Sequence, residues 1–376
     1  MRRRDGLAAA LLALGMPALR AQGGEPDDPV RRGRPMRFPR DHGAHVGAAI
    51  EWWYVTGELR AQDARRFGFQ ITFFRSRTGL AEGLDSRFAA RHLLFAHAAL
   101  TDLGVRTHLH AQRIARWSGD ETSQLARAST RETDLRLGGW SLQREDHDGR
   151  SLYRSEFGSS PIAKGPKDFA LQLQLRATQP LLLQGDAGFS RKGPDEVQAS
   201  HYLSEPQLAA QGELRLAGQR LAVTGRAWLD HEWSDQLMHP DAVGWDWVGM
   251  NLDNGAALTA FRLRRADGSS LWAGGSWRSA SGALQVFGPD SVRFTPGRIW
   301  QSPASGARYP LQWALDTPAG MFEVRALLDA QELDSRGSTG TVYWEGLSDL
   351  YDAQQRRVGN GYLEMTGYAG RLRLGG

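Results

Sequence analysis

The sequence lacks cysteine altogether, and this absence excludes disulfide bonds and a lipid anchor on an N-terminal cysteine. Lysine is almost as scarce, because Lys164, Lys167 and Lys192 are the whole set among 376 residues. The arginines are spread along the chain without a dense basic block, which argues against nucleic-acid binding. The Gly-x-Ser-x-Gly nucleophile elbow, the Walker A loop and the Gly-x-Gly-x-x-Gly loop are also missing. The sequence therefore carries none of these hydrolase and nucleotide-binding signatures.

The first 21 residues have the pattern of an export signal. Arginines at positions 2–4 form a basic start, residues 7–16 form an apolar run too short to cross a bilayer, and cleavage is expected after Ala21. The stretch from Arg3 to Leu7 resembles a twin-arginine signal, with an ordinary secretory signal as the alternative. Removal of this leader takes away four arginines and one aspartate, so the formal net charge falls from +4 to about +1. We expect a periplasmic protein with no transmembrane segment in its mature chain.

Beyond residue 45, short segments of alternating apolar and polar residues dominate, separated by turn signals. Such segments occur at residues 52–56, 67–73, 171–175, 258–263 and 361–367. Hairpin turns are expected at Asp148-Gly149, Asn254-Gly255 and Asp267-Gly268, and one or two short helices near residues 85–95 and 120–130. Many short antiparallel strands favour an all-β sandwich or closed barrel, because closure leaves no exposed sheet edge.

The length of the chain predicts about two domains. Residues 22–45 are rich in glycine, proline, aspartate and arginine and lack periodicity, which is typical of a linker or a wrapping arm. A domain boundary is expected near residues 234–242, where Pro240 and Asp241 precede a new series of strands.

The segment from Ala227 to Trp233 holds the densest set of candidate functional groups. On a strand, Leu229, His231 and Trp233 would share one face and Trp228, Asp230 and Glu232 the other. An imidazole among apolar groups can exchange protons near neutral pH, and two carboxylates on one face raise each other's pKa or bind a cation. Asp230, His231 and Glu232 are therefore candidate catalytic residues, and a polar cluster that locks the two domains together is the alternative.

Aromatic residues next to acidic ones form the second kind of candidate site. In residues 51–57, adjacent tryptophans place one indole on each face of a strand, beside the carboxylate of Glu51. An aromatic wall with a polar anchor is typical of pockets for largely apolar ligands, and core packing is the alternative. The predicted ligand-binding residues are Glu51, Trp53, Tyr202, Trp233, Trp245 and Asp246.

The sequence gives little support for a metal site. His108 and His110 would lie on one strand face, but no third ligand accompanies them. We expect neither a metal ion nor another cofactor.

Four stretches together resemble the AttH-like family of secreted, lipocalin-like proteins related to carotenoid 1,2-hydratases. They are residues 51–57, residues 192–202, the Asp230-His231-Glu232-Trp233 motif and residues 244–247, and the resemblance extends over about residues 45–372. It implies two lipocalin-like (calycin-type) antiparallel β-barrel domains packed together, with a ligand pocket near their junction. The predicted division is a signal peptide at 1–21, an arm at 22–45, and barrels at 46–238 and 239–376.

The hydratase branch of this family adds water to a terminal double bond of an acyclic carotene, and His231 and Trp233 match its His-x-Trp element. That branch also has a tyrosine and an aspartate close together shortly downstream, and this sequence shows no counterpart there. Two functions remain open. One is a non-catalytic periplasmic binder of a hydrophobic, isoprenoid or lipid-like molecule, working beside an ABC-type permease. The other is a hydratase-like lyase that acts on an isoprenoid.

Overall fold

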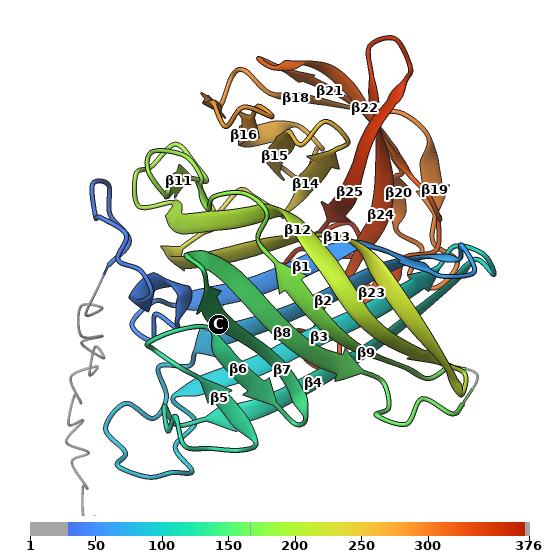
Figure 1. Cartoon of the computed structure of the whole chain (residues 1–376). Coiled ribbons are helices and arrows are strands. Elements are labelled where there is room, and N and C mark those ends of the chain that lie inside the picture. Colours follow the sequence, from blue (N-terminus) through green and yellow to red (C-terminus); the bar gives the residue numbers. More distant parts are fainter. Residues whose placement is uncertain (1–28, 166, 373–376) are drawn as a thin grey trace, which may run out of the picture.

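The computed structural model describes residues 29–372 except residue 166. The predicted export signal therefore lies outside the described residues. The described part is built from β-strands, which form two large antiparallel sheets and one short two-stranded ribbon (Figure 1). The prediction of an all-β, lipocalin-like architecture is confirmed.

The first sheet contains the thirteen strands β1 to β13. Their bounds are β1 (Ile50–Ala61), β2 (Arg66–Arg77), β3 (His92–Asp102), β4 (Thr107–Trp117), β5 (Ala126–Ala128), β6 (Asp134–Leu137), β7 (Trp140–His147), β8 (Arg150–Gly158), β9 (Phe169–Arg176), β10 (Leu182–Leu183), β11 (Phe189–Arg191), β12 (Ala199–Leu216) and β13 (Gln219–Gln236). The order is β4-β3-β2-β1-β13-β12-β9-β8-β7-β6-β5, with β10 and β11 paired to β12. The end strands β4 and β5 contact each other, so the sheet curls into a nearly closed barrel.

The second sheet is an open half-barrel of ten strands. Its strands are β14 (Gly244–Leu252), β15 (Ala257–Arg264), β16 (Ser270–Arg278), β17 (Leu284–Phe287), β18 (Arg293–Pro296), β21 (Gln312–Thr317), β22 (Gly320–Ala326), β23 (Glu332–Asp334), β24 (Val342–Asp352) and β25 (Arg357–Met365), and the ribbon is β19 (Ile299–Gln301) with β20 (Arg308–Pro310). The order is β17-β16-β15-β14-β25-β24-β22-β21-β18, with β23 paired to β24.

The three hairpin turns predicted from the sequence all connect paired antiparallel strands. Asp148-Gly149 joins β7 to β8, and the other two turns join β14 to β15 and β15 to β16. Asp148 and Gly149 have φ values of 54° and 74°, which is the left-handed backbone that a tight two-residue hairpin requires.

The helices predicted near residues 85–95 and 120–130 are wrong. From His92 onward the first segment forms β3, which pairs with β2 on one side and β4 on the other, and the second segment contains β5. The only helix among the described residues is a single 3-10 turn, η1 (Arg40–His42). No helix in this part of the chain is long and apolar enough to cross a membrane.

The segment before β1 is folded against the first barrel. Asp41, His42 and His45 are buried, and the indole nitrogen of Trp53 donates a hydrogen bond of 3.2 Å to the backbone oxygen of His42. The guanidinium of Arg75 donates to the backbone oxygen of His45 at 2.8 Å. These bonds attach the segment to β1 and β2.

Each sheet has its own apolar core, and a third apolar cluster lies between the sheets. At the junction, β1 contacts β25, β2 contacts β24, and β12 and β13 contact β14. The junction cluster includes Tyr54 and Trp228 from the first sheet and Trp247, Phe261 and Tyr362 from the second. Functional side chains on the outward face of β1, β12 and β13 therefore point at the second sheet.

Candidate functional site

Strand β13 separates its polar side chains into two groups because successive residues of a strand point to opposite faces. Leu229 belongs to the core of the first barrel, whereas its neighbour Trp228 belongs to the junction cluster. His231 follows Leu229 onto the barrel side, while Asp230 and Glu232 line a cavity at the junction. The motif thus supplies two separate sites on two faces of one sheet.

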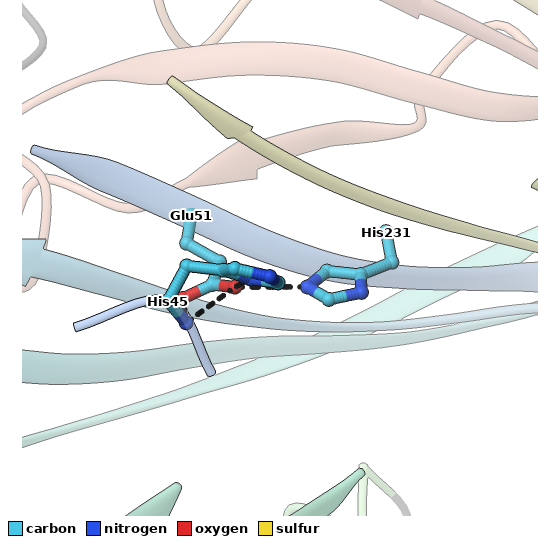
Figure 2. Close-up of side chains that lie close together, drawn as sticks. All are labelled: His45, Glu51 and His231. Carbon is cyan, nitrogen blue, oxygen red and sulfur yellow. Dashed lines mark hydrogen bonds and ion pairs between the residues drawn. The ribbon is translucent and has the colours of Figure 1, made fainter. Parts of the chain in front are cut away.

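On the barrel side, His231 joins a compact cluster with Glu51 and His45 (Figure 2). One carboxylate oxygen of Glu51, Oε1, lies 2.9 Å from His231 Nε2 and 2.8 Å from His45 Nδ1. The other oxygen accepts a hydrogen bond of 2.9 Å from Arg75 Nε. The imidazole of His231 also stacks on Trp53, with ring centroids 4.5 Å apart.

The charges in this cluster balance without a metal ion. Burial alone would raise the pKa of Glu51, but Arg75 and the two imidazoles hold that pKa well below its usual range. The three candidate ligand atoms lie within 4.8 Å of one another, yet each one is engaged in the hydrogen bonds just described. A divalent cation would have to displace those bonds beside a guanidinium, so the donor set fits a structural hydrogen-bond cluster better than a metal centre.

On the other face, a cavity of about 90 Å³ lies between the two sheets. It is lined by Ile50, Trp52, Tyr54, Thr72, Phe74, Lys192, Tyr202, Asp230, Glu232, Leu237, Met238, Trp245, Trp247, Phe261, Leu263, Tyr343, Glu345 and Glu364. Most of these side chains are apolar or aromatic, and a few carboxyl, hydroxyl and ammonium groups converge among them. This composition is typical of a site for a largely apolar ligand with one polar or reacting end.

Asp230 is held by three donors. Oδ1 accepts hydrogen bonds from Ser204 Oγ at 2.5 Å and Trp228 Nε1 at 2.7 Å, and Oδ2 accepts one from the Tyr202 hydroxyl at 2.7 Å. From the second sheet, Trp247 Nε1 donates to the Tyr202 hydroxyl at 3.1 Å. Burial raises the pKa of Asp230 to about 7 although the three donors favour its anion. Near neutral pH this carboxyl group can therefore both take up and release a proton.

Glu232 has a different environment, because a cation lies beside it. The ammonium of Lys192 is 2.9 Å from Glu232 Oε1, and Ser200 donates a further hydrogen bond to the same oxygen. The ammonium also lies 4.2 Å from the ring centroid of Phe261 and 4.6 Å from that of Tyr202. In the cavity wall, the positive charge of Lys192 therefore offsets the negative charge of Glu232.

The second sheet contributes two carboxyl groups that have no ion-pair partner among the described residues. Glu345 on β24 and Glu364 on β25 are directly paired across the strands, and both line the cavity. Burial, reinforced by the proximity of Glu364, raises the pKa of Glu345 well above its usual range, and burial raises the pKa of Glu364 to about 8. The Tyr54 hydroxyl lies beside Glu345, and its interaction with that carboxyl group partly offsets the effect of burial on the pKa of Glu345.

The structure divides the residues that the sequence analysis proposed. Asp230, Glu232, Tyr202 and Trp245 line the junction cavity. Glu51, Trp53, His231 and Trp233 lie on the barrel side of the sheet and do not line it, because they alternate with the cavity-facing positions along β1 and β13. Asp246 is buried elsewhere, 2.7 Å from Arg262 Nε and 2.9 Å from the Tyr368 hydroxyl. Of the adjacent tryptophans in β1, Trp52 faces the cavity.

The cavity also includes residues that the sequence analysis did not single out as site residues. Lys192 is one of only three lysines in the chain, whereas Glu345 is one of three carboxyl residues in its strand, with Asp349 and Asp352. The scarcity of lysine is visible in the sequence, but nothing in the sequence sets Glu345 apart. The Tyr202–Asp230 pair is a different case, because 28 residues separate its members and only the pairing of β12 with β13 brings them together.

Comparison with known proteins assigns this architecture to a family. A sequence model of the AttH-like family matches residues 29–368. The chain belongs to the AttH-like family. This match covers both sheets and every residue that lines the cavity.

Solved structures support the same assignment. A protein from Nitrosomonas europaea described as an AttH is 42% identical, with a TM-score of 0.81, over 91% of this chain and 99% of that chain. Kievitone hydratase from Nectria haematococca is 16% identical, with a TM-score of 0.67, over 90% of this chain and 94% of that chain. The protein CghA, solved with Sch210972, is 13% identical with a TM-score of 0.51, over 86% of this chain and 90% of that chain. The last two likenesses show a shared fold. No curated protein matches the chain.

Proposed function

We propose that this AttH-like protein is a hydratase-like lyase that adds water to a carbon–carbon double bond of a largely apolar, isoprenoid-like ligand. The observation that carries the proposal is the set of three carboxyl groups in the junction cavity, Asp230, Glu345 and Glu364, whose pKa values burial raises. Carboxyl groups that keep their protons near neutral pH can act as general acids.

Glu364 is the proposed acid. With a pKa of about 8 it holds its proton at neutral pH, and its side chain is less fully buried than those of the other carboxyl residues of the cavity lining. The π electrons of the double bond form a new C–H bond with this proton. A positive charge then develops on the more substituted carbon, and Glu364 is left as a carboxylate.

The aromatic wall stabilises that positive charge. Trp52, Trp245, Trp247 and Phe261 line the cavity from both sheets. The face of an aromatic ring attracts a cation, and the attraction is strongest where water is excluded. The carboxylate that proton transfer leaves on Glu364 adds favourable electrostatics.

Asp230 is the proposed base. A lone pair of the water oxygen forms the C–O bond, and the proton that this water loses passes to the Asp230 carboxylate, which Tyr202, Ser204 and Trp228 orient. Return of one proton from Asp230 to Glu364 through solvent restores both groups, so one water is added and nothing else is consumed. In this proposal Tyr202 and Asp230, which are hydrogen-bonded to each other, take the part of the tyrosine–aspartate pair that the sequence lacks downstream.

The shared fold with kievitone hydratase, whose name describes the same class of reaction, is in line with this proposal. At 16% identity that likeness concerns the fold, and the chemistry is assigned from the carboxyl groups of this chain. An isoprenoid-like ligand matches the mainly aromatic and aliphatic wall of the cavity.

The proposal is tested by incubating the purified protein with lycopene and shorter acyclic isoprenoids and detecting products heavier by one water. We expect Glu364→Gln to lower kcat by about 10²- to 10⁴-fold, the usual contribution of a general acid. Glu213→Gln, on the part of β12 remote from the cavity, is the matched control and should keep full activity. If the wild type binds these isoprenoids tightly but converts none of them, the protein is instead a non-catalytic carrier. In that case an ABC-type permease becomes the expected partner and the periplasm the expected location.

A further inference from the structure

We infer that a second, larger groove, which adjoins the junction cavity, binds the apolar tail of an elongated ligand whose reacting end occupies the cavity. The groove has a volume of about 310 Å³ and shares Ile50, Phe74, Trp245, Tyr343 and Glu364 with the cavity. The inference rests on the proposed function, because it assumes that the reacting end of the ligand occupies the junction cavity. It adds a separate binding compartment and the class of ligand that this compartment accepts.

The volumes of the cavity and the groove indicate which part of the ligand each one holds. The inner cavity, at about 90 Å³, is smaller than the roughly 150 Å³ apolar cavity that is known to hold one benzene molecule. It therefore has room for a terminal group of a few carbon atoms. A ligand with any larger apolar part must extend through the shared residues into the groove.

The groove wall presents mainly apolar surface, with neutral hydroxyl groups from serine and threonine side chains such as Ser338 and Thr341 among it. Leu93 and Phe95 of β3 line it, and the ring of Phe95 stacks on Phe74 with centroids 4.7 Å apart. His97 lines it too, but burial lowers the pKa of this imidazole to about 3, so the ring is neutral. Both ring nitrogens of His97 are hydrogen-bonded, at 2.8 Å, to the hydroxyls of Tyr343 and Ser338.

The described groove lining contains one acidic and one basic residue. Glu364 is shared with the inner cavity, and the other is Arg77, whose guanidinium is paired with Glu82 at 2.8 Å. Beside Arg77, the side chain of Leu80 is 85% exposed and continues the apolar wall to the protein surface. A wall of this kind offers no anchor for an anionic or cationic tail, so the ligand class is a neutral, flexible aliphatic chain.

A graded series of saturated probes tests the groove without requiring turnover. We would measure binding of the straight-chain alcohols from hexanol to tetradecanol by titration calorimetry. Burial of one methylene group is worth about fourfold in affinity, so the dissociation constant should fall about fourfold per added carbon until the groove is full and then level off.

Leu93→Trp fills part of the groove without touching the inner cavity, because Leu93 lines only the former. We expect the loss of affinity in this variant to increase along the series, from a small loss for hexanol to at least a tenfold loss for tetradecanol. Met321→Trp is the matched control, since Met321 is 62% exposed and lines neither compartment, and it should follow the wild-type series.

An unchanged chain-length series in Leu93→Trp would overturn the groove as a tail site, and so would a wild-type affinity that does not increase with chain length. Folding of the variant is checked by its melting temperature. Thr341→Trp, at the position just before β24, narrows the same groove from another side and gives an independent second test. The alcohols contain no double bond. Failure of the hydratase proposal therefore appears as absent turnover, and failure of the groove appears as absent length dependence.

Discussion

The hydroxyl of Tyr202 on β12 donates a 2.7 Å hydrogen bond to Asp230 on β13 and accepts one of 3.1 Å from Trp247 on the opposite sheet. Burial, and then the charge of Asp230, raise the pKa of Tyr202 well above its usual range, so the hydroxyl remains a donor. A carboxyl group that titrates near neutral pH is in this way connected to both sheets. Its protonation state bears on the stability of the fold as well as on the proposed chemistry.

The first prediction concerns the pH dependence of stability. The pKa of Asp230 is about 7 in the folded state and 3.8 ordinarily, so between these values the folded protein binds more protons than the unfolded chain. Stability from this group is therefore fully present below about pH 4 and is lost as the pH rises toward 7. We expect Asp230 to contribute a decrease of about 2 kcal/mol in the free energy of unfolding between about pH 5 and pH 7.

Chemical denaturation of the wild type and of Asp230→Asn across this pH range measures that contribution. The variant cannot titrate at this position, so its stability should fall less steeply. Parallel curves for the two proteins would show that Asp230 titrates as an ordinary carboxyl group.

The second prediction concerns His231. Its imidazole bonds Glu51 and stacks on Trp53 inside the barrel, and it does not line the cavity. We expect His231→Ala to lower the free energy of unfolding by about 1–3 kcal/mol, because a buried acceptor loses its donor. Binding of dodecanol should be unchanged. A variant with its stability intact and its binding lost would assign His231 to the ligand site instead.

The strand alternation of residues 228–233 could be predicted from the sequence because the side-chain period of two is a property of every strand. That pattern separated His231 from Asp230 and Glu232 correctly, and the turn signals located three hairpins. The pattern did not predict which face of β13 contacts the second sheet. Both faces of β13 carry tryptophan and polar side chains, so hydrophobicity alone does not distinguish them.

The set of residues that line the cavity could not be predicted from the sequence either, because strands distant in sequence bring them together. Asp230 meets Tyr202 through the register of β12 against β13, and Glu345 meets Glu364 through the register of β24 against β25. Register between strands distant in sequence follows from packing of the whole sheet, which a single sequence does not display. The prediction of helices near residues 85–95 and 120–130 was wrong for a related reason. Pairing with neighbouring strands outweighed the weak local helix propensity of these segments.

The third prediction concerns metal binding. Glu51 already accepts hydrogen bonds from His45, His231 and Arg75, so we expect the cluster to take up no divalent cation. Adding zinc sulfate or a chelator should leave the melting temperature unchanged. A rise in the melting temperature with zinc that disappears in both His45→Ala and His231→Ala would instead establish a metal site.

The fourth prediction concerns export. The leader-like residues 1–21 predict a mature chain that begins at Gln22 and accumulates in the periplasm. N-terminal sequencing of protein from fractionated cells checks this directly. Recovery of the chain in the cytoplasm with Met1 or Arg2 at its end would refute it.

The central claim is that the junction cavity adds water across a double bond, and isotope labelling tests it most directly. Wild-type protein is incubated with an acyclic isoprenoid in water enriched in oxygen-18, and in a parallel reaction in heavy water. The account predicts an alcohol that carries one labelled oxygen and, in heavy water, one new carbon–deuterium bond, with both signals lost in Glu364→Gln. Recovery of unaltered, tightly bound isoprenoid, or of a product whose oxygen is unlabelled, would contradict it.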